Sequence, residues 1–162
     1  MFFRQIVNDR LGCCAYVIAS GAEAAIVDPG YDIAPYERIL NERSLRLRYV
    51  IDTHVHADHI SGARLLAAAH GAELCLHEQA RVSYPVRWMR DAQELAVGMV
   101  RLRMMHTPGH RPEMMSVLVT DLERGLEPVA VLTGDSLLVG DAGRPDFSGG
   151  DPFAQYESIQ RL

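Results

Sequence analysis

Short apolar runs separated by turn residues dominate the chain, and they predict a protein rich in β-strands. Runs such as "CCAYVIA" and "AELCLH" have the length of ordinary strands; the first lies between Gly12 and Ser20, and the second follows Gly71. Strands are predicted over residues 2–7, 13–19, 23–30, 45–54, 72–77, 100–107 and 114–121, and one or two more over 127–140.

Apolar residues three or four positions apart predict a few helices among these strands. Ile33, Tyr36 and Leu40 show this spacing in the first such segment. Helices are predicted over residues 33–44, 60–71 and 153–162. Many strands with few helices predict two sheets packed together with helices outside, an α/β layered domain that spans residues 1–162 as a single unit.

Polar side chains cluster directly after several of the predicted strands. The stretch "THVHADHISG" places three histidines and one aspartate within six positions, and "HTPGH" and "TGD" follow two later strands. Imidazole nitrogens and carboxylate oxygens bind metals, and loops at strand ends commonly carry the chemistry of layered folds. The sequence therefore predicts a metal site. The candidate ligands are His54, His56, Asp58, His59, His110 and Asp135.

Composition narrows the class of protein further. The 162 residues carry a net charge of -5, which argues against nucleic acid or an anionic membrane as the main partner. No apolar run approaches the roughly 20 residues that a membrane helix needs, and the charged N-terminus is unlike a signal peptide. Cys13, Cys14 and Cys75 are interpreted as reduced thiols in the core of a cytoplasmic protein.

Several other polar residues are given structural interpretations. His70 and His77 are taken as structural histidines, His70 at a helix end before Gly71, and His106 as a packing or supporting residue. Asp28, before Pro29 and Gly30, is expected to stabilise a turn. The remaining interpretations are a buried or loop-fixing ion pair for Arg144 and Asp146 and a surface position for Arg111.

The motif His54-x-His56-x-Asp58-His59, followed by "HTPGH" and "TGD", resembles the metallo-β-lactamase superfamily. The order and spacing of these motifs match from "VDPG" at residues 27–30 through to "GRPD" at residues 143–146. The resemblance implies an αβ/βα sandwich of two mixed sheets with outer helices, and a metal site at one edge of the sheets.

Two branches of that superfamily resemble the chain. Similarity to persulfide dioxygenases, strongest in "LTGDSLLVGDAGRPDF", implies one Fe(II) held by His54, His110 and Asp135, with His56, Asp58 and His59 nearby as supporting groups. The substrates implied are O2 and a thiol persulfide such as glutathione persulfide. Similarity to glyoxalase II implies instead one or two Zn(II) ions and hydrolysis of a glutathione thioester, with Asp58 and His59 helping to hold a second zinc.

The resemblance also implies a further strand and a late histidine beyond the helix predicted at residues 153–162. No histidine follows His110, so the domain is expected to be C-terminally incomplete. A third hypothesis follows, in which the chain is an inactive metal-binding domain. Alternatively, it is half of an assembly that another chain completes. The expected partners are a second copy of the chain or a rhodanese-type protein that works with it.

Overall fold

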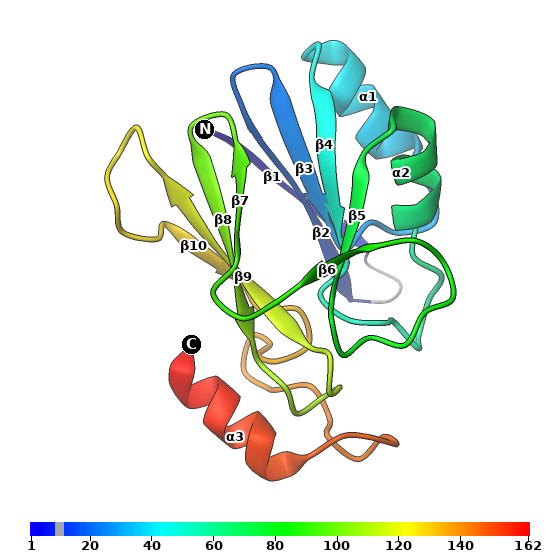
Figure 1. The fold of residues 1–162 in the computed structure, drawn as a ribbon, viewed down its shortest axis with the longest axis vertical. Helices are drawn as coiled ribbons and strands as arrows, with labels where there is room; N and C mark the ends of the chain where they lie inside the picture. The colour runs from blue at the N-terminus through cyan, green and yellow to red at the C-terminus, as the bar shows by residue number, and fades with distance from the viewer. Residues whose placement is uncertain (9–11) are drawn as a thin grey trace.

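The computed structural model describes residues 1–8 and 12–162, and its two β-sheets lie face to face (Figure 1). The first sheet contains, in spatial order, β1 (Phe2–Asn8), β2 (Cys13–Ser20), β3 (Glu23–Val27), β4 (Arg46–Ile51), β5 (Glu73–His77) and β6 (Arg87–Met89). The second contains β10 (Ala130–Leu132), β9 (Met115–Asp121), β8 (Val100–His106) and β7 (Glu94–Val97). The helices are α1 (Ala34–Glu42), α2 (Ala63–His70) and α3 (Pro152–Arg161).

Strand direction explains why the middle of the first sheet is so apolar. β1, β2 and β3 pair antiparallel, whereas β3, β4, β5 and β6 pair in parallel, and the second sheet is antiparallel throughout. Parallel strands are usually covered on both faces, so their side chains are apolar on both. The run from Ala24 to Val27 in β3 is completely buried, as this rule requires.

Two apolar layers hold the sheets and helices together. One lies between the sheets and includes Ile18, Val27 and Ile51 from the first sheet together with Leu102 and Val117 from the second. The other layer lies between the first sheet and helices α1 and α2, which cover its outer face (Figure 1). The predicted sandwich of two sheets is confirmed.

Local signals fix where the helices begin and end. Asp32 accepts a hydrogen bond from the backbone N–H of Ala34 at the start of α1. Helix α2 ends at Gly71, whose φ of 61° is a left-handed conformation that glycine adopts at little cost. Asp151 caps α3 by accepting from two backbone N–H groups. None of the helices in the described ranges is long and apolar enough to cross a membrane.

The structure differs from the predicted elements mainly in the second half of the chain. The short strands β6 and β7 were not predicted, because three or four residues give too little periodicity to recognise. The apolar segment at residues 127–140 contains only β10, at Ala130–Leu132. Gly134, with a φ of 49°, turns the chain away from the sheet, and Val139 beyond it is fully exposed.

Candidate metal centre

His54 is presented by the segment that leaves the end of β4, and it is buried. Its Nδ1 lies 3.0 Å from Oγ1 of Thr53, and that hydroxyl donates its own hydrogen to Asp28 at 2.9 Å. Thr53 must therefore accept from Nδ1, which leaves the Nε2 lone pair of His54 available as a ligand. Burial, with the neighbouring His56, lowers the pKa of His54 to about 3, so the imidazole is neutral.

His110 lies on the loop between β8 and β9 and has the same tautomer. Its Nδ1 donates to the backbone carbonyl of Arg144 at 2.9 Å, which again leaves Nε2 as the ligand nitrogen. Asp135 follows β10, and its Oδ2 lies 3.5 Å from Nε2 of His110 and 3.8 Å from Nε2 of His54. Burial raises the pKa of the Asp135 carboxyl group above its usual value.

These three side chains fit a divalent metal. The ligand atoms of His54, His110 and Asp135 all lie within 4.8 Å of one another, and they come from three different strand ends. Each histidine has its other ring nitrogen fixed by a hydrogen bond, as is usual for metal-binding histidines. The donor set of two imidazoles and one carboxylate suits iron or zinc.

His56 stands beside this group and is held by Asp28. The rings of His54 and His56 lie 4.2 Å apart between centroids, and Nε2 of His56 donates to Oδ1 of Asp28 at 3.2 Å. Burial opposes a charge on His56, but the hydrogen bond and the negative charge of Asp28 raise its pKa to about 9. With Nε2 engaged, Nδ1 is the nitrogen of His56 that could bind a metal.

Asp28 therefore does more than the turn role predicted for it. Its φ of 48° is a turn conformation, but its buried carboxylate also accepts from the N–H and the hydroxyl of Thr53 and from His56. Burial acts to raise the pKa of Asp28, and these hydrogen bonds, led by that from His56, hold it below its usual value. Asp28 thus fixes the orientation of both His54 and His56.

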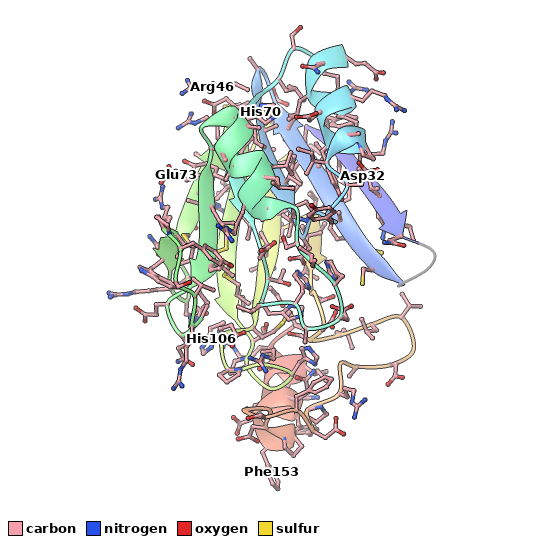
Figure 2. All side chains as sticks on the ribbon, turned by 90° about the vertical axis from the view of Figure 1, so that its right-hand side faces the viewer. Asp32, Arg46, His70, Glu73, His106 and Phe153 are labelled. Atoms are coloured by element: carbon pink, nitrogen blue, oxygen red, sulfur yellow. The ribbon has the colours of Figure 1, made fainter. Side chains whose placement is uncertain are left out.

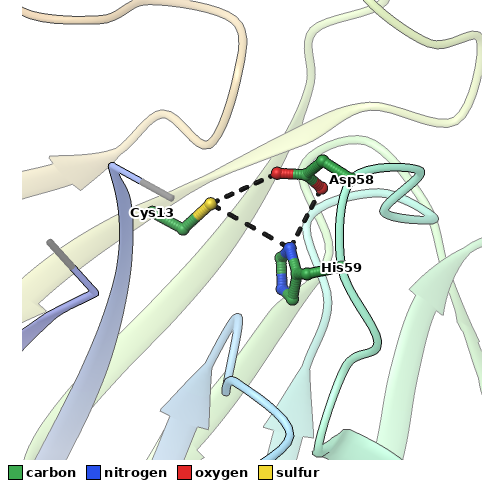
Figure 3. A group of neighbouring side chains, drawn as sticks. All are labelled: Cys13, Asp58 and His59. Carbon is green, nitrogen blue, oxygen red and sulfur yellow. Dashed lines mark hydrogen bonds and ion pairs between the residues drawn. The ribbon is translucent and has the colours of Figure 1, made fainter. Parts of the chain in front are cut away.

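Asp58 and His59 lie beside Cys13, at the start of β2 (Figure 3). Oδ1 of Asp58 lies 3.0 Å from Nδ1 of His59, and Oδ2 accepts a hydrogen bond from Sγ of Cys13 at 3.3 Å. The prediction of core thiols is correct for Cys75, which is fully buried. It is wrong for Cys13 and Cys14, which are only half-buried, and Cys13 contacts predicted site residues.

The sequence profile described as the metallo-beta-lactamase superfamily matches residues 8–162. The chain belongs to the metallo-β-lactamase superfamily. Within that superfamily, a probable metallo-hydrolase of Burkholderia pseudomallei is 33% identical in an alignment of 140 positions that covers 72% of this chain and 48% of the relative. The mitochondrial persulfide dioxygenase ETHE1 of Homo sapiens is 30% identical, over 85% of this chain and 52% of its own length. A hydroxyacylglutathione hydrolase of Brucella anthropi is 29% identical, in an alignment that covers 96% of this chain and 56% of the hydrolase.

Solved structures of the metallo-β-lactamase superfamily share the fold. A metallo-beta-lactamase from Staphylococcus aureus superposes with a TM-score of 0.91 at 32% identity, covering 99% of this chain and 51% of that one. ETHE1 from Myxococcus xanthus superposes with a TM-score of 0.87 at 32% identity, and the superposition covers 100% of this chain and 69% of ETHE1. The chain spans about half the length of the curated relatives it matches, at 48%, 52% and 56% of their lengths.

The other histidines of this metallo-β-lactamase domain lie outside the groups of possible ligands. His77 and His106 stack on each other, with centroids 3.9 Å apart and planes 11° apart, and His106 donates to the carbonyl of Pro112. His70 ends α2 and lies 3.8 Å from Glu37. Figure 2 places His70 at the opposite end of the molecule from Phe153 in α3. These positions agree with the structural roles predicted for all three.

Two arginines near the centre hold loops. Arg144 pairs with Asp146 through two hydrogen bonds of 2.7 Å, and both side chains are exposed, so the ion pair fixes a loop but is not buried. The backbone of Arg144 contributes more to the centre, because its carbonyl positions His110. Arg111, predicted at the surface, is partly covered and contacts Glu113 and the carbonyl of Ser148.

Helix α3 connects the two loops that carry His110 and Asp135. The side-chain amide of Gln155 donates to the carbonyl of Ser136, next to Asp135, at 2.6 Å. The hydroxyl of Ser158 donates to the carbonyl of Pro108, in the loop of His110, also at 2.6 Å. Both α3 side chains are buried, so the helix braces two of the three candidate ligands.

Asp28→Asn is expected to weaken metal binding about 10–100-fold, the range seen when a group supporting a ligand is lost. The side-chain amide of the new asparagine can donate a hydrogen bond to the hydroxyl of Thr53. That hydroxyl would then donate to Nδ1 of His54, and the ring hydrogen of His54 would move from Nδ1 to Nε2, the nitrogen that binds the metal. The lost hydrogen bonds should also cost about 1–3 kcal/mol in the free energy of unfolding. Titration calorimetry with Zn(II) and urea unfolding measure the two effects.

Asp32→Asn is the matched control, since Asp32 is exposed and its side chain accepts a hydrogen bond from the backbone N–H of Ala34, two residues on. Asparagine can accept the same hydrogen bond from the backbone two residues on, so metal affinity and stability should stay close to those of the wild type. Equal loss of metal affinity in the two variants would show that Asp28 does not control the ligand tautomer.

Proposed function

We propose that this chain is the catalytic metal domain of an iron-dependent persulfide dioxygenase. The observation that carries the proposal is the group formed by His54, His110 and Asp135, with ligand atoms within 4.8 Å of one another. Two histidines and one carboxylate on one face of a metal leave adjacent positions open, an arrangement typical of non-haem Fe(II) oxygenases. The persulfide dioxygenase ETHE1 among the relatives supports the same choice.

The proposed reaction converts a thiol persulfide, O2 and water into the thiol and sulfite. The outer sulfur gives up four electrons, and O2 accepts them. Fe(II), when bound, would supply neighbouring positions for the persulfide sulfur and for O2. The chain's own residues hold the ligand tautomers through Thr53 and Arg144 and balance the local charge through Asp28.

A cavity beside the candidate ligands has the size needed for such a substrate. It has a volume of about 430 Å³, and its lining includes the polar His56 and Asp135 and the apolar Leu137, Leu138 and Val139. Small-molecule sites generally fall in the range of about 300–1,000 Å³. We propose glutathione persulfide as the substrate and the cytoplasm as the location.

Thioester hydrolysis is the second candidate function. It is favoured by His56, which turns Nε2 toward Asp28 and could add Nδ1 to a zinc site with His54 and His110. A hydroxyacylglutathione hydrolase is among the relatives. In that case Zn(II) would replace Fe(II), and water would attack the thioester carbonyl.

Oxygen uptake decides between the two reactions. The chain is first loaded with Fe(II) in the absence of oxygen. Glutathione persulfide and O2 are then added, and the consumption of O2 and the formation of sulfite are measured. The metal-free chain is the control. The proposal predicts iron-dependent uptake with one sulfite formed for each O2. In parallel, the Zn(II)-loaded chain is tested on S-lactoylglutathione. Confirmed iron binding without O2 uptake, whether or not the thioester is hydrolysed, would overturn the dioxygenase proposal.

A further inference from the structure

Another cavity, with a volume of about 700 Å³, adjoins the two loops that carry His54 and His110. Val55, the residue after His54, lines it, and so does Arg111, the residue after His110. Its other walls come from the turn after β5 and from residues 148–149. None of its described lining residues is a candidate metal ligand or lines the cavity of about 430 Å³, so it is a separate site.

Arg111 is held in this cavity by two hydrogen bonds. Its Nε donates to Oε1 of Glu113 at 3.4 Å, and its Nη1 donates to the backbone carbonyl of Ser148 at 3.2 Å. Glu113 is buried, and its carboxylate also accepts from the backbone N–H of Val55 at 3.3 Å. The remaining N–H groups of the Arg111 guanidinium are therefore held in place, which reduces the side-chain entropy lost when a ligand binds to them.

Arg81 brings a second guanidinium to the cavity, and no described side chain neutralises it. Arg81 lies in the turn after β5 and is exposed, and no hydrogen bond or ion pair engages its side chain in the described part of the chain. The glutamates that line the cavity already have partners, because Glu78 pairs with Arg90 at 2.7 Å and Glu113 pairs with Arg111. The arginines around the cavity therefore exceed the glutamates by one charge, although the whole chain has a net charge of -5.

We propose that Arg81 and Arg111 bind a small organic carboxylate in this cavity. A guanidinium matches the two oxygens of a carboxylate with parallel hydrogen bonds. The volume of about 700 Å³ lies in the range of about 300–1,000 Å³ that small-molecule sites have, and it exceeds what a single inorganic ion would fill. Two guanidinium groups from separate loops favour a molecule with two carboxylate groups. The proposal does not depend on which reaction the metal centre catalyses.

Succinate tests the site, with succinamide as an uncharged analogue of similar shape. The chain is titrated with each compound at constant ionic strength, and the NMR signals of the arginine Nε–Hε groups are recorded, because they report the two side chains directly. We expect succinate to shift the signals of Arg81 and Arg111 to saturation at millimolar concentrations, and succinamide to leave both unchanged. Sulfate is the inorganic comparison and should bind more weakly than succinate.

Arg81→Gln removes one guanidinium without removing a hydrogen bond or ion pair between described residues. The dissociation constant for succinate should rise more than about tenfold, the factor that one hydrogen bond to a charged group contributes. Arg103→Gln is the matched control and should bind succinate as the wild type does. Arg103 is also exposed, lies in β8, and has no side-chain hydrogen bond or ion pair in the described part of the chain.

The proposal is overturned if succinate fails to shift the signals of Arg81 and Arg111, or if succinamide or sulfate binds as tightly as succinate does. Unchanged affinity in Arg81→Gln, or an equal loss of affinity in Arg81→Gln and Arg103→Gln, would also overturn it.

Discussion

His110→Ala is expected to abolish tight iron binding and, with it, O2 uptake. Only three side chains make up the proposed iron site, and removing one leaves two ligands at a centre that needs three from the protein. The loss of affinity should exceed the roughly 10–100-fold that loss of a supporting group costs. Iron retained after desalting, measured by colorimetric assay, gives the result directly.

His77→Ala is the control for this experiment. His77 is as deeply buried as His110 but stacks on His106 and belongs to none of the groups of possible ligands in the described part of the chain. It should lose stability through the lost packing while retaining iron. Equal loss of iron in the two folded variants would show that the ligand assignment is wrong.

Gly109→Ala is expected to destabilise the protein by about 2–6 kcal/mol and to weaken iron binding. The φ of 145° at Gly109 costs a residue with a side chain about 1–3 kcal/mol. In addition, the new Cβ would lie 2.3 Å from the Cα of Gln155, so α3 must move, which adds about 1–3 kcal/mol. Because His110 is the next residue, its imidazole would be displaced as well. Urea unfolding and iron retention measure the two effects.

Gly125→Ala separates the two causes. Gly125 has a similar φ of 154°, but a Cβ there meets nothing within 4 Å among the described residues. This variant should show only the backbone cost of about 1–3 kcal/mol and should bind iron as the wild type does. If the two variants lost the same stability, the contact between Gly109 and α3 would have no energetic importance.

The main layers of the fold and the six candidate ligands could be predicted because both follow from local patterns. Apolar runs of strand length mark the strands, and polar residues directly after them mark the edge of the sheets. His54, His110 and Asp135 lie at three such strand ends, and the structure brings them together. Nothing in the spacing alone could show which of the six candidate ligands would share one centre, because that depends on how the loops turn.

Other parts of the centre depend on contacts that sequence spacing does not show. Asp28 also follows an apolar strand, so the strand-end rule could have found it, but the following proline and glycine suggested only a turn. Cys13 lies in an apolar run and looks like a core residue until the fold places it beside Asp58. The carbonyl of Arg144 carries no sequence signal at all, since any residue could supply it.

The bracing by α3 makes metal binding and helix docking parts of one thermodynamic cycle. Gln155 and Ser158 hold the loops of Asp135 and His110, so the docked helix favours the arrangement of ligands that a metal requires. Linkage is reciprocal, and a metal that prefers the docked state must stabilise that state by the same free energy. Metal binding at the centre should therefore be measurable in α3, because the backbone amide hydrogens of this helix would exchange with solvent more slowly in the metal-bound protein.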